Sequence, residues 1–124
     1  MNSDHPFWNH IGLTEVFKKD GLSKIELEVT GLLTQRHGTV HGGVLATMVD
    51  AAVGTSIRSL LPEKKAAVTV EMKVNYLRPS TGSKLIGEGR IINKGQSIIV
   101  GEAQIKNEDG KVVAHGTATY MIVK

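Results

Sequence analysis

Asp50 is the residue whose surroundings in this sequence most strongly suggest chemistry. It is the only charged residue between Gly42 and Ile57. On a helix its neighbours three and four positions away cannot form an ion pair with it; they are Ala46, Thr47, Val53 and Gly54. A buried carboxylate without a counter-charge is costly, and such groups are candidates for general bases or nucleophiles. The alternative is a structural carboxylate bound by an arginine or by backbone amides from elsewhere.

A glycine-containing segment precedes Asp50. Residues 35–43 read Gln-Arg-His-Gly-Thr-Val-His-Gly-Gly. Glycine lets the backbone approach a ligand closely, and the first N–H groups of a helix form an anion site. An amide of Gly42 or Gly43 could therefore hold the oxyanion that develops when a carbonyl carbon is attacked. A tight turn followed by a helix cap is the plainer interpretation of the same residues.

A long helix must position these groups. Apolar residues recur at three- and four-residue steps from residue 42 to residue 61, and Pro62 ends the pattern. The apolar positions extend around much of the helix, which predicts that it is deeply buried. They are Val44, Leu45, Met48, Val49, Ala52, Val53, Ile57, Leu60 and Leu61.

Strand patterns occur on both sides of this helix. Residues 13–17 and 23–29 flank a Lys-Asp-Gly turn at 19–21 and predict a hairpin. From residue 66 the pattern has period two, with Val68 and Val70 alternating with Thr69 and Glu71, and further strands are predicted at 84–93, 97–106 and 111–122. Residues 1–12 predict a short helix or an ordered arm. The order favours an α+β fold with one long helix on a largely antiparallel sheet of five to six strands, and disfavours a doubly wound nucleotide fold.

Composition narrows the possible functions. The 124 residues suit one domain, and a net charge of +3 with 4% aromatic residues does not favour nucleic-acid binding. The absence of cysteine excludes disulfides and thiol catalysis, and the five histidines are not expected to form a metal site. The longest stretch without Asp, Glu, Lys or Arg has 13 residues, short of the roughly 20 that a membrane span needs. We expect a cytoplasmic protein without a metal, a nucleic-acid partner or a membrane partner.

One combination of residues is more specific. His41-Gly42-Gly43, followed by an uncharged helix with an acid nine residues after the histidine, resembles the hotdog-fold acyl-CoA thioesterases, in particular the phenylacetate-degradation type. Residues 74–79, Val-Asn-Tyr-Leu-Arg-Pro, are similar to that family's strand-to-turn signature. The order of elements also agrees from about residue 12. The resemblance implies a single hotdog domain over residues 1–124.

The resemblance implies a role for five residues. Asp50 would attack the thioester or activate water, and the Gly42 N–H would polarise the thioester carbonyl. Gln35 would line the same centre, His41 would help to orient the loop and the carbonyl, and Thr69 would hold the water. In this family the site lies at a dimer interface, so Asp50 would act with Gly42 of the neighbouring subunit. The exposed edge of a single sheet also favours a homodimer or a dimer of dimers.

The resemblance further implies that coenzyme A enters as part of the substrate, so no separate cofactor is expected. Predicted substrate contacts include the pocket-wall residues Gly43, Val53, Gly54 and Ile57, the arginine Arg78, and the turn residues Lys94, Gly95, Gln96 and Ser97. The alternative for Arg78 is a solvated arginine, and the alternative for residues 94–97 is an ordinary hairpin turn. Small residues beside Asp50 leave room for an aryl or medium-chain acyl group.

Two other functions on the same fold stay open. A non-catalytic module could bind acyl-CoA without turnover. A hydratase or dehydratase would also use a helix acid and a histidine, but the proline-glycine loop typical of those enzymes is absent before the helix.

Overall fold

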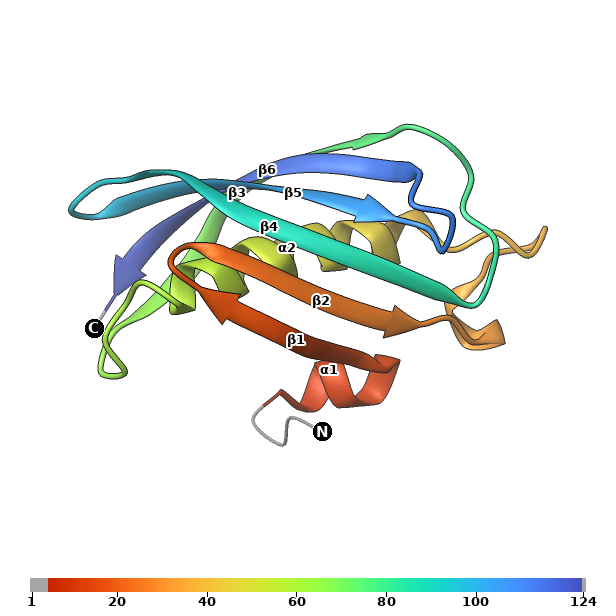
Figure 1. Cartoon of the computed structure of the whole chain (residues 1–124), viewed down its shortest axis with the longest axis horizontal. Helices are drawn as coiled ribbons and strands as arrows, with labels where there is room; N and C mark the ends of the chain where they lie inside the picture. Colours follow the sequence, from red (N-terminus) through yellow and green to blue (C-terminus); the bar gives the residue numbers. More distant parts are fainter. Residues whose placement is uncertain (1–4, 124) are drawn as a thin grey trace.

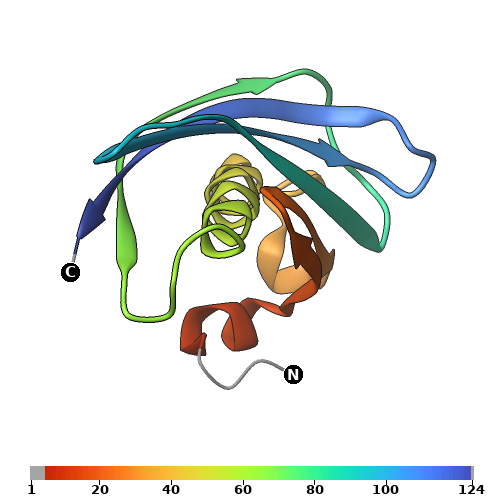
Figure 2. The same ribbon diagram turned by 60° about the vertical axis from the view of Figure 1, so that its left-hand side comes forward.

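The computed structural model describes residues 5–123, which form one six-stranded antiparallel sheet and one long helix. The sheet order is β1-β2-β4-β5-β6-β3, and Figure 2, which looks nearly along α2, shows the sheet curving around this helix. The predicted α+β architecture is confirmed. In chain order the elements are α1 (Pro6–Ile11), β1 (Leu13–Lys19), β2 (Leu22–Glu28), a 3₁₀ turn η1 (Gly31–Leu33), α2 (Gly42–Arg58), β3 (Ala66–Tyr76), β4 (Lys84–Lys94), β5 (Ile98–Lys106) and β6 (Val112–Val123), as labelled in Figure 1.

The N-terminal segment holds α1 within the predicted 1–12 region, and residues 1–4 of that prediction lie outside the described residues. Trp8 is the buried residue of α1. None of the helices in residues 5–123 is long and apolar enough to cross a membrane.

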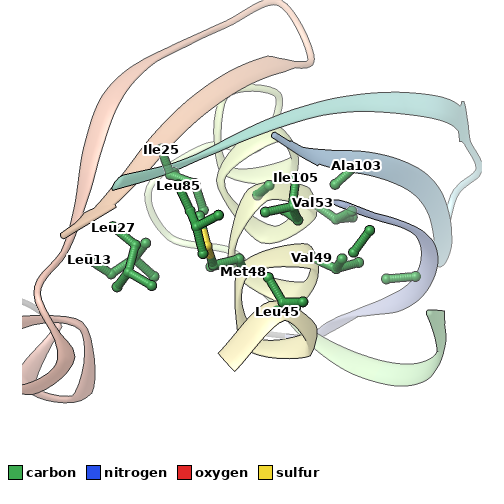
Figure 3. Close-up of a cluster of buried hydrophobic side chains, with 14 of the residues drawn as sticks. Leu13, Ile25, Leu27, Leu45, Met48, Val49, Val53, Leu85, Ala103 and Ile105 are labelled. Atoms are coloured by element: carbon green, nitrogen blue, oxygen red, sulfur yellow. The ribbon is translucent and has the colours of Figure 1, made fainter. Parts of the chain in front are cut away.

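The core lies between α2 and the concave face of the sheet. Figure 3 shows Leu45, Met48, Val49 and Val53 of α2 directed towards side chains from the strands. Full burial of each such side chain contributes roughly 1.5–3 kcal/mol. Gly89 of β4 sets the spacing, because a Cβ there would lie 2.6 Å from the Ala52 carbonyl oxygen. The helix backbone therefore rests almost directly on the sheet, which fixes the position of its other residues.

The helix is shorter than predicted. It ends at Arg58 rather than at residue 61. The Ser59 hydroxyl donates to the Ser56 carbonyl at 2.6 Å and accepts from the Gly21 N–H at 2.7 Å. These bonds tie the last turn to the β1–β2 hairpin, and Pro62 disfavours helical geometry in the residue before it.

β3 departs from simple alternation. Its pairing with β6 shifts register between Thr69 and Glu71, which marks a β-bulge at Val70. Before the bulge Thr69 pairs with Tyr120, and after it Met72 pairs with Ala118; both partners are buried. Thr69 and Met72 therefore share the concave side, whereas the period-two pattern places them on opposite faces. The bulge directs the Thr69 hydroxyl towards α2.

Candidate active site

Asp50 is half-buried on α2 and is held by hydroxyl groups from two strands. Its Oδ1 accepts hydrogen bonds from Thr69 Oγ1 at 2.8 Å and from the Tyr120 hydroxyl at 2.6 Å. Among residues 5–123 no arginine and no backbone amide is recorded as a donor to this carboxylate, and its recorded donors are the two hydroxyl groups. Within residues 5–123 no donor is recorded for Oδ2. One carboxylate oxygen is thus anchored, and the other is available.

Tyr120 of β6 was not predicted as a site residue. It is 6% exposed, and its hydroxyl lies 2.6 Å from Asp50 Oδ1 and 2.7 Å from the Asp50 carbonyl oxygen. Burial, and then the hydrogen bond to Asp50, raise the pKa of Tyr120 well above its ordinary value. The hydroxyl therefore stays protonated and remains a donor. Its sequence signal is weak: a tyrosine that follows the small residues Ala114, Gly116 and Ala118 on the core face.

The start of α2 leaves one glycine amide available. His41 is the N-cap, and its Nδ1 accepts from the Gly43 N–H at 2.9 Å. The amides of Val44 and Leu45 donate to the His41 carbonyl. No acceptor is recorded for the Gly42 N–H among the described residues. Of the two amides considered from the sequence, that of Gly43 is used for capping, and that of Gly42 stays the candidate oxyanion donor.

Gly42 opens onto a cavity of about 540 Å³ that Gln35, Tyr76 and Arg78 also line. Gln35 is exposed, and its amide nitrogen donates to Thr39 Oγ1 at 3.1 Å. The Tyr76 hydroxyl donates to the Gly42 carbonyl at 3.0 Å. Tyr76 was not predicted to contact this site, although it lies within the 74–79 motif. The structure therefore brings Gln35, His41, Gly42 and Arg78 to one end of α2.

Asp50 lines a second cavity, of about 240 Å³. Gly54 and Ile57 line it as predicted. Val53 does not: it is fully buried, and a Cβ on Gly101 of β5 would lie 2.8 Å from its Cγ1. Successive helix residues point about 100° apart, so the residue beside Gly54 faces the sheet. Val53 thus belongs to the core of the single chain, and its contact with substrate stays a prediction.

Within one chain, the predicted site residues lie in separate places. Asp50 and Gly42 are eight residues apart on α2, which is about 12 Å along the helix axis, and they line different cavities. Arg78 hydrogen-bonds Val113 near the start of β6, whereas Ser97 hydrogen-bonds Ile122 near its end. The turn formed by Lys94, Gly95, Gln96 and Ser97 thus lies at the opposite end of β6 from Arg78.

Comparison with known proteins assigns the family. The model of the thioesterase superfamily matches residues 37–114, which include Gly42, Asp50 and Thr69. The chain belongs to the thioesterase superfamily. A putative esterase of Halobacterium salinarum is 33% identical over 107 residues, covering 82% of this chain and 70% of the relative. A medium/long-chain acyl-CoA thioesterase of Escherichia coli K12 is 28% identical over 96 residues, covering 67% of this chain and 62% of the relative.

Solved structures share the fold of this thioesterase-superfamily chain. A thioesterase family protein from Silicibacter pomeroyi has a TM-score of 0.92 at 30% identity, covering 98% of this chain and 91% of that one. A Bacillus halodurans protein solved with CoA has a TM-score of 0.78 at 31% identity, covering 81% and 66%. A phenylacetic acid degradation protein from Thermus thermophilus has a TM-score of 0.85 at 26% identity, covering 94% and 97%. The fold is the hotdog fold that the resemblance implies.

Proposed function

We propose that this chain is an acyl-CoA thioesterase that hydrolyses an aryl- or medium-chain acyl-CoA to the free acid and coenzyme A. One observation carries the proposal: Asp50 is held on Oδ1 by two hydroxyl donors, while Oδ2 has no recorded donor among the described residues. The names of the curated relatives support acyl-CoA as the substrate class, and a structural neighbour solved with CoA supports the carrier.

The complete site requires two copies of the chain. β3 is an edge strand whose only partner among the described strands is β6, and it exposes Val68, Val70, Met72 and Tyr76. Pairing two copies along β3 would cover this edge and place their α2 helices side by side. In a two-fold pair each contact occurs twice. Ala46 lies midway between Gly42 and Asp50, so a two-fold axis near Ala46 brings Asp50 of one copy to Gly42 of the other.

The proposed reaction then uses one carboxylate oxygen and one amide. Asp50 Oδ2 either takes a proton from water, whose oxygen attacks the thioester carbon, or attacks that carbon itself to give an anhydride that water hydrolyses. In both routes the carbonyl oxygen becomes negative and accepts the Gly42 N–H of the other copy. The C–S bond then breaks, the thiolate leaves and takes up a proton, and the acid is released. Thr69 and Tyr120 keep Oδ1 fixed, so Oδ2 faces the substrate.

Thiol release tests the proposal directly, because the chain has no cysteine and a thiol reagent reports only product. Acetyl-, phenylacetyl-, benzoyl-, hexanoyl- and lauroyl-CoA are compared with wild type and Asp50→Asn. We expect turnover that falls by roughly 10²–10⁴ in Asp50→Asn, with an unchanged thermal melting curve as the folding control. Binding of acyl-CoA without turnover by the wild type would instead indicate a non-catalytic module, and hydration of an enoyl-CoA would indicate a hydratase.

A further inference from the structure

The cavity at Asp50 is also lined by a positively charged side chain, Arg58. Asp50, Gly54 and Arg58 are spaced by four residues on α2 and lie on one helix face. All three line the cavity of about 240 Å³, as does Lys65. Resting on the proposed thioesterase function, we propose that the preferred acyl group carries a carboxylate at its distal end, which binds the Arg58 guanidinium.

The Arg58 guanidinium has N–H groups that make no recorded hydrogen bond to the described residues. Its Nη2 donates to Thr55 Oγ1 at 2.8 Å. The nearest carboxylate oxygen, on Glu15, lies 3.9 Å away, beyond hydrogen-bond distance. Arginine carries five N–H groups, and the contact with Thr55 is its one recorded hydrogen bond to the described residues. A planar guanidinium with free N–H groups is suited to bidentate binding of a carboxylate.

The surroundings of Arg58 favour the binding of an anionic group, because the guanidinium is partly buried. Burial lowers the pKa of Arg58 from its ordinary value, and Glu15 only partly opposes this effect. The side chain is 38% exposed, and partial loss of water without full pairing is unfavourable for a cation. A ligand carboxylate would supply the missing acceptors. Lys65 adds a second positive charge to the same cavity wall.

The guanidinium is held beside Trp8 and Gly54. It lies over the Trp8 ring, with Cζ 5.6 Å from the ring centroid. Its Nη1 lies 3.7 Å from the position that a Cβ on Gly54 would occupy, so the side chain folds back along the helix. Gly54 is one turn from Asp50, about 6 Å along the axis. This spacing suits a five- or six-carbon diacid monothioester, with the thioester at Asp50 and the carboxylate at Arg58.

The size of the cavity argues that it receives the acyl group and not the CoA moiety. Pockets for drug-sized ligands usually measure about 300–1,000 Å³, and the cavity at Asp50 is smaller at about 240 Å³. The cavity at the start of α2 is larger, about 540 Å³, and has its own arginine, Arg78. The phosphates of CoA are another source of negative charge that Arg58 could bind. The experiment therefore includes hexanoyl-pantetheine, which separates binding of CoA phosphate from binding of the acyl carboxylate.

The test compares substrates of equal chain length. Adipyl-CoA and hexanoyl-CoA, and glutaryl-CoA and pentanoyl-CoA, differ within each pair only at the end of the acyl chain. For the wild type we expect kcat/KM to be about tenfold or more higher for the carboxylated member of each pair. Arg58→Met should abolish this preference by lowering the rate on adipyl-CoA, while the rate on hexanoyl-CoA stays within about threefold. Lys111→Met, in the exposed β5–β6 turn, is the control with the same change of net charge.

Several results would overturn the proposal. Equal or better cleavage of hexanoyl-CoA by the wild type would refute it while leaving the thioesterase function intact, and this comparison does not require any variant to fold. An Arg58→Met defect of the same size on both acyl-CoAs, absent with hexanoyl-pantetheine, would assign Arg58 to CoA phosphate. A wild type that cleaves none of these four acyl-CoA thioesters and none of the acyl-CoAs of the earlier panel would refute the thioesterase function and the inference with it.

Discussion

The two ends of the candidate site on α2 are built in different ways. At the start of the helix the proposed active group is a backbone amide, and the contacts around it are largely local: His41 caps Gly43 two residues away, and Gln35 contacts Thr39. At Asp50 the contacts come from residues distant in sequence, Thr69 on β3 and Tyr120 on β6. The first end depends on a turn and a cap, whereas the second depends on the sheet.

This difference shows where each half is vulnerable. The amide at Gly42 has no recorded acceptor among the described residues, whereas the next three amides are paired within the helix start, so changes to the local backbone should affect it most. The carboxylate at Asp50 is oriented by a buried tyrosine and a strand bulge, so changes to β3 or β6 should affect it even when the helix is intact. The predictions below test each half separately.

Among variants that retain Asp50, Gly42→Pro should have the largest effect. Proline is well tolerated at the first position of a helix, and His41 already has the extended conformation that a following proline favours, with φ −62° and ψ 137°. The substitution removes the unpaired N–H, so we expect kcat to fall by roughly 10²–10³ with a nearly unchanged melting temperature. Gly42→Ala is the control, since it retains the N–H and its Cβ would lie at an ordinary 3.4 Å from Tyr76. Equal loss in both variants would contradict the amide role.

A mixture of two inactive variants tests whether Asp50 and Gly42 of one site come from different copies. If Asp50 of one copy acts with Gly42 of the other, a mixed dimer of Asp50→Asn and Gly42→Pro has both defects in one site and an intact second site. After subunit exchange we expect recovery of up to about a quarter of wild-type activity. An absence of recovery in demonstrably mixed dimers would place both residues of a site in the same chain.

Tyr120→Phe should have an intermediate effect. It removes the hydroxyl that lies 2.6 Å from Asp50 Oδ1 but retains the buried ring. Hydrogen bonds to charged groups contribute about 1.5–3 kcal/mol, so we expect kcat to fall by about 10- to 100-fold with little change in KM. Thr69→Val tests the second donor in the same way. A Tyr120→Phe variant with wild-type kcat would show that Tyr120 is only a packing residue.

Glu102→Gln should affect stability without affecting the site. Glu102 lies on the outer face of the sheet, where it contacts His115 at 3.0 Å and also Arg90. The hydrogen bond from His115 is the main cause that lowers the Glu102 pKa. A lowered native pKa stabilises the fold above the unfolded value near 4.5, and this contribution is lost as the pH falls through the native pKa.

Urea unfolding at pH 6 and near pH 2.5 measures this contribution. We expect Glu102→Gln to be less stable than wild type by less than about 1 kcal/mol at pH 6, and the difference to disappear at the acidic pH. Turnover should be unchanged. A loss of turnover would contradict this expectation and show that the outer face of the sheet influences the site.

Much of the arrangement could be predicted from local pattern. The helix start at Gly42 was predicted correctly because a glycine pair precedes apolar residues at helical spacing, and the first hairpin was predicted from its turn residues. The end of α2 was missed because Ser59 bonds to Gly21, 38 residues away. Asp50 could be found from its uncharged helix neighbours, but those neighbours carry no information about Tyr120.

By itself, the sequence determined the order of elements, the isolated acid on the helix, and the glycine amides before it, because helix periodicity, caps and turns depend on residues a few positions apart. Only the tertiary structure decided which amide is left unpaired, that Val53 faces the core, and that Thr69 and Tyr120 hold Asp50. The bulge in β3 places Thr69 on the concave side, against the alternation of its own strand. Such contacts depend on strand register, which is set by pairing between distant segments and not by local sequence.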